Sequence, residues 1–531
     1  MSQRPLGAQI SHMLKARGVD VIFGIPGVHN VEMYRGIEEA GITHVLARHE
    51  QGAGFMADGY ARASGRPGVC YVITGPGLCN AMTPLGQAYS DSVPVLALSS
   101  CLDETAITRG QLHQMRDQQV AAATVCEWSE EARTPKAAYG LIDRALTEWQ
   151  SGRARPKHIQ VPINDLAALA EAAPQASPAA RMPVVSDADL RTVCDRVLSA
   201  RKPLFIFGGG SVGAADCVPR LLEATGAAAF MTYAGRGVVP AEHPMSFGSY
   251  LARPDSVQIM QDADLVVAFG TELSEVDLWR PELGHDCPMI RVDIDTEVLG
   301  NLRASDMAVV GDAGGMIRAM NIALAARVDD RKPLWDRAMI AKTRARWRAD
   351  LQSERPGILP VCDALQEVLP EDAMIYSDMT SFAYAAKEIW DMARAGHWHH
   401  PYGFGTLGYA LPAAIGGAVA RPSLPTIAIA GDYGFQYTVQ ELGTAVELGL
   451  GLPILLWDNA KLAEIEDAMV RSQIAPNAVV AQNPDFLALA RAYGAHATEP
   501  KDLKALQQAV VDALAASVPT VIRMTPALSA K

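Results

Sequence analysis

The stretch from residue 426 to 467 constrains the fold of this 531-residue chain more than any other part. Apolar runs at 427–430 and 452–457 predict two buried strands, and the segment between them has apolar residues at helical spacing. Strand, helix and strand in this order form a parallel crossover unit. Because both strands of such a unit end on the same edge of the sheet, we expect the residues that follow them, Asp432 and Asn459, to meet there.

Asp432 and Asn459 offer a carboxylate and an amide oxygen, which are ligands that suit Mg2+ bound to phosphate groups. A less specific interpretation stays open, since an Asp after a strand is often a turn residue and an Asn often caps a helix. The pair therefore predicts a magnesium and phosphate site only in combination with other motifs.

The rest of the chain also alternates strands with helices, and this alternation predicts a parallel, doubly wound α/β architecture. A segment rich in Ala and Pro at 163–185 separates the first part from the second. We predict three α/β domains with parallel sheets, at residues 1–165, 183–325 and 356–531.

Charge and cysteine content narrow the functional class. The formal net charge of −13 provides no basic surface for nucleic acid. No apolar run approaches the roughly 20 residues that a membrane-spanning helix needs, and the first residues lack the apolar core of a signal peptide. The eight cysteines are scattered without a CxxC pair. We therefore expect reduced thiols in a cytoplasmic protein that binds neither nucleic acid nor a membrane.

Three further segments carry a resemblance to a known family. RHEQGAGFMADGYARASGRPGV at 48–69, TGPGLCNAMTPLGQAYSDSVPVL at 74–96 and GFGTLGYALPAAIGGAVARP at 403–422 resemble thiamin-diphosphate (ThDP) enzymes of the acetolactate synthase and 2-oxo acid decarboxylase group, as does the 426–467 stretch. The resemblance covers essentially the whole chain, with the middle domain matched by pattern alone. It implies pyrimidine-binding, middle and diphosphate-binding domains in that order. It also implies an active site between subunits, and hence a homodimer or homotetramer.

Glu50 is the catalytic residue that the resemblance implies in the first domain. In this family a Glu that follows His hydrogen-bonds N1′ of the cofactor's aminopyrimidine, and protonation there favours the 4′-imino form that deprotonates C2 of the thiazolium ring. A carboxyl group in an apolar pocket can hold and return that proton near neutral pH. From its position alone, Glu50 fits better as a helix-start residue that stabilises the helix dipole. The surrounding motif favours the catalytic role.

The resemblance also implies which residues hold the cofactor. Asp432, Asn459 and the main-chain carbonyl of Lys461 are expected to bind Mg2+, with diphosphate oxygens and water completing an octahedron. Leu407 corresponds to the bulky residue that keeps the two cofactor rings bent toward each other. Further cofactor contacts are expected from Pro26, Gly27, Thr74, Gly75, Asn80, Asp378, Thr380, Gly405, Gly431, Tyr433 and Gly434.

Two positions depart from the family's metal signature, which begins Gly-Asp-Gly and ends Asn-Asn. Tyr433 stands where the third residue is normally Gly, and Asp458 replaces the first Asn. Because Gly permits backbone dihedrals that Tyr resists, the first departure leaves the local turn geometry open.

The Gly-Gly-Gly run at 208–210 follows a predicted strand of the middle domain but lacks the GxGxxG spacing of a dinucleotide-binding loop. We interpret it as a packing feature or a vestigial dinucleotide site. Related enzymes bind FAD or ADP in this domain, so FAD is compatible with the resemblance but is not predicted. The incomplete spacing also disfavours a NAD dehydrogenase.

His113 and Gln114 bear on the outcome of the reaction. Acetolactate synthases usually carry Phe-Gln at this place. An imidazole there could supply the proton that ends a simple decarboxylation and releases an aldehyde. A solvated loop histidine is the alternative interpretation.

Acidic residues after Asn459 bear on the substrate. Glu464 and Asp467 are three positions apart and share a helical face, which suits a cationic guanidinium tail. A solvated acidic face is the commoner reason for such a run. The runs GIPGVHN, LHQMRDQ and GDYGFQYT resemble those of 5-guanidino-2-oxopentanoate (2-ketoarginine) decarboxylases.

We therefore predict an enzyme that decarboxylates this 2-oxo acid without oxidation, giving 4-guanidinobutanal and CO2. One alternative is a carboligase like acetolactate synthase, acting on pyruvate. The other is a catalytically silent paralogue that only binds its ligands.

Overall fold

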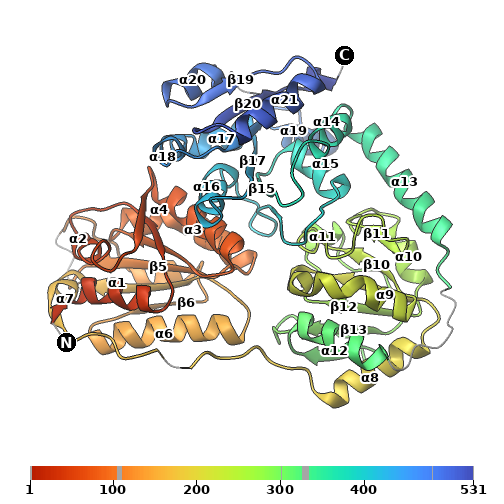
Figure 1. The fold of residues 1–531 in the computed structure, drawn as a ribbon, viewed down its shortest axis with the longest axis horizontal. Coiled ribbons are helices and arrows are strands. Elements are labelled where there is room, and N and C mark those ends of the chain that lie inside the picture. Colours follow the sequence, from red (N-terminus) through yellow and green to blue (C-terminus); the bar gives the residue numbers. More distant parts are fainter. Residues whose placement is uncertain are drawn as a thin grey trace. The chain divides into compact units, whose positions relative to one another are not determined.

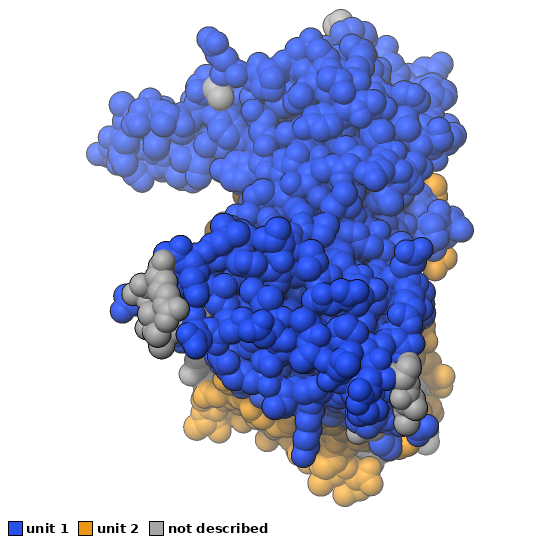
Figure 2. All heavy atoms as spheres, turned by 90° about the vertical axis from the view of Figure 1, so that its left-hand side faces the viewer, with its two compact units in different colours: residues 1–180, 373–381, 400–526 blue, residues 181–372, 382–399, 527–531 orange. Residues whose placement is uncertain are grey.

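The computed structural model describes residues 3–104, 110–176, 178–300, 302–325, 334–480 and 482–529. Contacts divide the chain into two compact units, which have different colours in Figure 2. Unit 1 comprises residues 1–180, 373–381 and 400–526, and unit 2 comprises residues 181–372, 382–399 and 527–531. Within the described ranges, no helix is both long enough and apolar enough to cross a membrane.

The first sheet lies in unit 1 and is parallel throughout, with the strand order β3-β2-β4-β5-β7-β6. Its strands are β2 (Val21–Gly24), β3 (Thr43–Leu46), β4 (Gly68–Val72), β5 (Val95–Cys101), β6 (Trp128–Glu131) and β7 (Lys157–Pro162). The helices are α1 (Leu6–Ala16), α2 (Val31–Tyr34), α3 (Glu50–Ser64), α4 (Pro76–Ser90), α5 (Gln118–Ala123), α6 (Pro135–Ser151) and α7 (Ile163–Ala167). A short antiparallel pair, β1 (Arg4–Pro5) and β8 (Leu169–Ala170), lies beside them. Strands β4 and β5 are buried along their whole length, as expected for a sheet with helices on both faces.

The second sheet of unit 1 contains the parallel order β15-β17-β18-β20-β19. Its strands are β15 (Met374–Ser377), β17 (Thr426–Gly431), β18 (Pro453–Trp457), β19 (His496–Thr498) and β20 (Thr520–Met524). The helices are α16 (Ala410–Ala420), α17 (Asp432–Thr438), α18 (Glu441–Glu447), α19 (Ala463–Arg471), α20 (Phe486–Ala492) and α21 (Leu503–Leu514). The crossover unit expected in the 426–467 stretch is therefore β17 and β18 with two short helices between them.

Helices α3 and α16 join the two sheets of unit 1 and lie side by side in Figure 1. The rings of Phe55 and Tyr409 meet edge to face with their centroids 5.6 Å apart. The Tyr409 hydroxyl donates a hydrogen bond to Asp58 Oδ1 at 2.9 Å, and Arg62 forms an ion pair with the same carboxylate at 2.7 Å. One hydrophobic core runs from the first sheet into the second. The first and last parts of the chain thus fold as one body.

Unit 2 has its own parallel sheet with the strand order β11-β10-β9-β12-β13-β14. Its strands are β9 (Pro203–Phe207), β10 (Ala228–Met231), β11 (Ser246–Gly248), β12 (Leu265–Phe269), β13 (Met289–Asp293) and β14 (Met307–Val310). Strand β16 (Trp398–His399) also falls within the residues of unit 2 but is not part of this sheet. The α-helices are α8 (Asp187–Ser199), α9 (Val218–Thr225), α10 (Ser256–Asp262), α11 (Glu275–Leu278), α12 (Ala313–Ala325), α13 (Arg337–Glu354), α14 (Ile358–Gln366) and α15 (Ser381–Ile389). The Gly-Gly-Gly run opens a 3-10 helix (Gly209–Cys217). Backbone bonds from Gly208 N to Phe269 O and from Gly210 N to Gly270 O fix this run against the loop after β12, in agreement with a packing role.

The predicted fold class is confirmed: the chain is α/β with three parallel sheets. These sheets fall within residues 21–162, 203–310 and 374–524. The domain boundaries that we predict remain a prediction, because contacts group the first and third parts into a single unit.

Candidate active site

Glu50 is the first residue of α3 and is buried, with 9% of its surface exposed. The preceding His49 caps the helix, since its Nδ1 accepts a hydrogen bond from Gln51 N at 3.1 Å. Asn80 on α4 donates from Nδ2 to Glu50 Oε2 at 2.9 Å. The carboxyl group is therefore held at a helix N-terminus by a side chain that comes from a different helix.

The Gly75 loop connects Glu50 with His113. Gly75 has a φ of 71°, a left-handed conformation that favours Gly, and its N–H donates to Gln118 Oε1 at 2.8 Å. A Cβ atom on Gly75 would lie 2.4 Å from the carbonyl oxygen of His113, and one on Gly77 would lie 3.2 Å from Glu50 Oε1. Only Gly at positions 75 and 77 lets the loop lie this close to both His113 and Glu50.

His113 contacts a second histidine that sequence reasoning missed. His113 Nδ1 and His29 Nδ1 are 3.2 Å apart. His29 follows the predicted cofactor residues Pro26 and Gly27, and both imidazoles are half-buried. Gln114 Oε1 accepts a hydrogen bond from Gln111 N at 3.2 Å, within the same turn. The run GIPGVHN contained the only available signal for His29, but no rule of spacing connects it with a residue 84 positions later.

A network of buried hydrogen bonds holds the Gly75 loop in place. Gln118 Nε2 donates to Ser99 Oγ, to the Ser100 carbonyl and to Gln160 Oε1 at 2.8–3.0 Å. Thr74 joins the network through its hydroxyl, which lies 2.7 Å from Ser100 Oγ. Sequence reasoning missed this network as well, because its members come from three separate strands and helices.

Asp432 begins α17 directly after β17, and its carboxylate is buried. In the sheet Gly431 is paired with Trp457, so the residues that follow them, Asp432 and Asp458, are neighbours at the carboxyl edge. Asn483 Nδ2 donates to Asp432 Oδ2 at 2.8 Å and to Asp458 Oδ1 at 2.9 Å. Burial raises the pKa of Asp432, and the carboxylate of Asp458 raises it further. Such a poorly solvated pair of acids favours a cation nearby.

The other predicted metal ligands lie on the segment after β18. Asn459 is half-buried, and its Oδ1 accepts a hydrogen bond from Lys461 N at 3.3 Å. The Lys461 side chain contacts Glu466 at 2.5 Å, so its charge is turned toward that acid. The described residues contain no group of three or more His, Cys, Asp or Glu side chains able to hold a metal ion. The predicted metal site does not require such a group, since its ligands are one carboxylate, one amide oxygen and one main-chain carbonyl.

The structure explains both departures from the metal signature. Tyr433 lies inside α17 with its N–H donating to Asp432 Oδ1 at 3.0 Å, and its φ is not positive. No Gly is needed there, so the turn geometry that the sequence left open is an ordinary helix start. Asp458 Oδ2 accepts a hydrogen bond from Arg523 Nε at 2.7 Å. Arg523 thus compensates the charge that Asp brings in place of Asn.

Gly434 is the residue of this signature that has no room for a side chain, since a Cβ would lie 2.3 Å from Asp378 Oδ2. Gly434→Ala is therefore expected to lower the stability of unit 1 by about 1–3 kcal/mol, because the rigid neighbour cannot move without losing its own bonds. Thermal unfolding measures the loss. Gly443→Ala on α18 is the matched control, with its nearest atoms at 3.5 Å, and we expect no loss there. Equal midpoints for the two variants would contradict the expectation.

Asp378 shapes the loop that carries Leu407. Its carboxylate is buried and accepts hydrogen bonds from Gly408 N and Met379 N, both at 2.9 Å, while its own N–H donates to Ile429 O. Burial raises the pKa of Asp378 to about 7. Leu407 itself is half-buried and Thr380 is buried beside Gly431. The nearby Gly405 has a φ of 66°.

Glu441 links the two parts of unit 1 at the start of α3. Its carboxylate accepts hydrogen bonds from Arg48 N and His49 N at 2.9–3.1 Å and from the Thr444 hydroxyl at 3.0 Å. Burial raises the pKa of Glu441 to about 7. This residue, which sequence reasoning did not single out, fixes the backbone immediately before Glu50.

The raised pKa of Glu441 gives a pH dependence with a defined sign. A carboxyl group that binds its proton more tightly in the folded state favours folding at low pH, and this contribution is lost as the pH rises from about 4.5 to about 7. Glu441→Gln should therefore show a smaller fall of the unfolding midpoint than the unsubstituted protein over that range. The exposed Glu447→Gln on the same helix is the control. If the unfolding midpoint of Glu441→Gln falls with pH as steeply as that of the unsubstituted protein, this expectation is contradicted.

Glu464 and Asp467, the predicted substrate residues, lie on α19, which has no buried residue. Glu464 is half-exposed and Asp467 is exposed. Their neighbour Glu466 is engaged by Lys461. The acidic face thus lies on the surface of unit 1, beside the segment that carries Asn459.

The predicted site residues form two half-sites within one chain. One half-site lies around Glu50 and His113, the other lies around Asp432 and Asn459, and Glu441 bonds the backbone that precedes Glu50. Each half-site is organised by its own network, through Asn80 and Gln118 in one and through Asn483 and Arg523 in the other.

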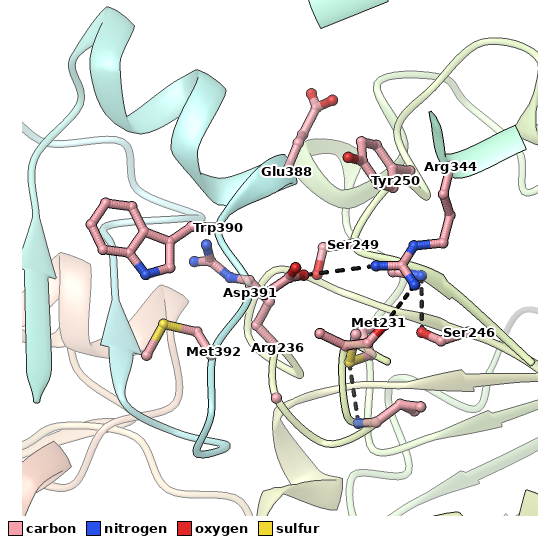
Figure 3. Close-up of a pocket in the computed structure, with 14 residues that line it drawn as sticks. Met231, Arg236, Ser246, Ser249, Tyr250, Arg344, Glu388, Trp390, Asp391 and Met392 are labelled. Atoms are coloured by element: carbon pink, nitrogen blue, oxygen red, sulfur yellow. Dashed lines mark hydrogen bonds and ion pairs between the residues drawn. The ribbon is translucent and has the colours of Figure 1, made fainter. Parts of the chain in front are cut away.

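Unit 2 contains a small crevice, shown in Figure 3, where Arg236, Arg344, Glu388 and Asp391 gather. Arg344 lies 3.8 Å from Asp391 Oδ1, and burial raises the pKa of that carboxyl. The volume of the crevice is about 10 Å3, which is room for about one water molecule. This crevice is too small to be a flavin site.

Comparison with protein families matches three models along the chain. They are described as thiamine pyrophosphate enzyme N-terminal TPP binding domain (residues 4–121), central domain (190–320) and C-terminal TPP binding domain (378–524). The chain is 42% identical to the probable 2-ketoarginine decarboxylase AruI of Pseudomonas aeruginosa, over 94% of this chain and 90% of that protein. It is 29% identical to the acetolactate synthase isozyme 1 large subunit of Escherichia coli, over 87% of this chain and 83% of that subunit.

Proposed function

This chain belongs to the thiamine pyrophosphate enzyme family, and we propose that it decarboxylates 5-guanidino-2-oxopentanoate to 4-guanidinobutanal and CO2 with ThDP and Mg2+. The observation that carries the proposal is the buried carboxyl group of Glu50, which Asn80 holds at the start of α3 in the domain that matches the N-terminal TPP binding model. Similarity to a probable 2-ketoarginine decarboxylase over nearly the whole chain supports the choice of substrate.

The residues present fit the cofactor. When bound, ThDP supplies a carbon nucleophile that adds to the 2-oxo group and accepts the electrons released with CO2. The carboxyl group of Glu50 would hydrogen-bond the aminopyrimidine, and the Gly75 loop beside it has no side chain at Gly75 or Gly77. Asp432, Asn459 and the Lys461 carbonyl would hold Mg2+, since a single buried carboxylate with two neutral oxygens suits a hard cation that also binds diphosphate.

We further propose that the enzyme is a homodimer or homotetramer in which the two half-sites come from different chains. Figure 2 shows one face of unit 1 hollowed between its N-terminal and C-terminal parts. Apolar side chains are exposed on both parts: Val28, Val31, Leu112 and Val120 on one, and Tyr437, Ile465, Val470, Ile474 and Val480 on the other. In this proposal, association with another chain would cover part of this apolar surface.

In this proposal His113, with Gln114 beside it, provides the proton that the substrate carbon needs after CO2 leaves. His113 is held beside the Gly75 loop that also contacts Glu50. An imidazole can donate a proton near neutral pH, which would convert the decarboxylated substrate into a free aldehyde. This feature favours simple decarboxylation over carboligation.

The guanidinium tail of the substrate would pair with Glu464 and Asp467. We expect that the double variant Glu464→Gln, Asp467→Asn raises KM for the guanidino acid roughly 10- to 100-fold, because hydrogen bonds between charged groups are lost. KM for 2-oxopentanoate, whose tail carries no charge, should stay the same. Asp512→Asn, an exposed acid on α21, is the control. Parallel changes for both substrates would contradict a role in charge recognition.

A screen for CO2 release over 2-oxo acids tests the proposed function. The protein is incubated with ThDP, Mg2+ and each acid, and aldehyde is measured alongside CO2. We expect the highest kcat/KM with 5-guanidino-2-oxopentanoate. A much higher value with pyruvate would reject that substrate, and absence of CO2 with every acid would reject the function.

The second candidate function is carboligation of pyruvate, which similarity to acetolactate synthases favours. It predicts an acetohydroxy acid product, which gives acetoin after acid treatment, in the same screen.

The cysteines in the described structure are all free, which supports a reducing compartment, and the cytoplasm is the location that we propose.

A further inference from the structure

Two imidazoles are in contact at the Glu50 half-site, and the proposed reaction uses only one of them. His29 Nδ1 and His113 Nδ1 are 3.2 Å apart, with ring centroids at 4.8 Å and an interplanar angle of 78°. At this distance one nitrogen donates a proton and the other accepts it. One ring therefore carries hydrogen on Nδ1, and the other has a bare Nδ1.

The fold holds both rings in place. His113 has a φ of 64°, an uncommon conformation for a residue with a side chain, and its carbonyl oxygen packs against Gly75. Next to His29, the side chain of Asn30 is buried, accepts a hydrogen bond from Gly27 N at 2.6 Å and donates to Ile25 O at 3.2 Å. The contact between the imidazoles thus joins two fixed backbone segments.

The surroundings decide which ring stays neutral. Burial lowers the pKa of His29, and the neighbouring charge on His113 lowers it further, while Asp103 after β5 raises it. These are the titratable groups that act on His29 among the described residues. Because burial disfavours the cationic form of His29, we assign the bare, accepting Nδ1 of the pair to His29.

We propose that His29 is a positioning residue that fixes the tautomer of His113: its Nδ1 accepts a hydrogen bond from His113 Nδ1–H, so that Nε2 of His113 is the nitrogen that gives up and recovers the catalytic proton. This inference rests on the proposed function, in which His113 protonates the substrate carbon that has lost CO2. The cationic form of His113 gives its Nε2 proton to that carbon and becomes neutral with its Nδ1–H still bonded to His29. Water then returns one proton to Nε2, so each turnover consumes one proton from solvent.

Two substitutions at one position separate this role from simple packing. His29→Phe keeps an aromatic ring against His113 but removes the acceptor, whereas His29→Asn keeps an acceptor near the place of Nδ1. We expect His29→Phe to lower kcat for aldehyde release roughly 10- to 100-fold and to shift its pH profile. His29→Asn should recover most of the rate. His12→Asn, a half-buried histidine on α1 that interacts with Glu39, is the control.

A measurement without cofactor tests the assignment directly. In protein with 15N-labelled histidine, the NMR signals of neutral His113 should report hydrogen on Nδ1, and His29→Phe should return neutral His113 to the Nε2–H tautomer that is usual in solution. Hydrogen on Nε2 instead of Nδ1 in the neutral form of His113 would overturn the inference, as would full activity of His29→Phe. If no 2-oxo acid is decarboxylated, the proposed function fails, and the NMR result still decides the assignment of the pair.

Discussion

Replacing Glu50 with Gln should lower kcat for CO2 release by roughly 100- to 10,000-fold, the range that loss of a positioned acid–base group produces. Gln has nearly the shape of Glu and can still contact Asn80 Nδ2 through its amide oxygen, so the fold at the start of α3 should persist. The amide cannot hold the exchangeable proton that the aminopyrimidine requires. The loss is therefore expected in kcat, with cofactor affinity much less affected.

Two further measurements make the Glu50 result specific. Exchange of the cofactor's C2 proton with deuterated solvent, followed by rapid acid quench and NMR, should slow in the Glu50→Gln variant by a factor similar to that in kcat. The exposed Glu38→Gln serves as the control and should leave both rates unchanged. Normal C2 exchange in the Glu50→Gln variant would show that Glu50 has another role, and normal turnover would reject the proposed catalytic centre.

Sequence reasoning could predict the features that short stretches of the chain encode. The parallel α/β class followed from apolar runs separated by helical segments, and Asp432 is placed at the edge of the sheet because β17 ends there. The same reasoning gave Glu50 at the start of a helix. These features depend on local patterning, which the chain carries within a few tens of residues.

The supporting residues could not be predicted, because each acts across a large distance in the sequence. Asn483 is 51 positions from Asp432, and Glu441 is 392 positions from His49. Their side-chain types are common in loops and helices, so nothing local distinguishes them before the fold is known. Tyr433 is a different case: the sequence left its turn geometry open, and the structure places it in a helix without a positive φ, so Gly is not required there.

Replacing Asp432 with Ala should weaken ThDP binding in the presence of Mg2+ by at least about 100-fold, because the proposed metal site loses its only carboxylate ligand. The free energy of unfolding of the cofactor-free protein should change little in this variant. Asp432 is buried near Asp458, and the charge of Asp432 is unfavourable there without a cation. Calorimetric titration with ThDP and Mg2+ measures the affinity. Asp458→Asn, which restores the residue common in the family, is the matched control and should still bind the cofactor. Equal loss in both variants would contradict a metal site at Asp432.

The Asp432 and Glu50 variants together also test whether the active site spans two chains. If Glu50 and Asp432 of one site come from different subunits, a mixed dimer of Glu50→Gln and Asp432→Ala chains contains one site with both residues intact and one with both replaced. Co-expression with two affinity tags isolates this species, and we expect it to recover roughly half of the activity per dimer, because one of its two symmetric sites is complete. Dimers of either single variant should remain inactive. If both residues served a site within their own chain, every site of the mixed dimer would lack one of them, and no activity would return.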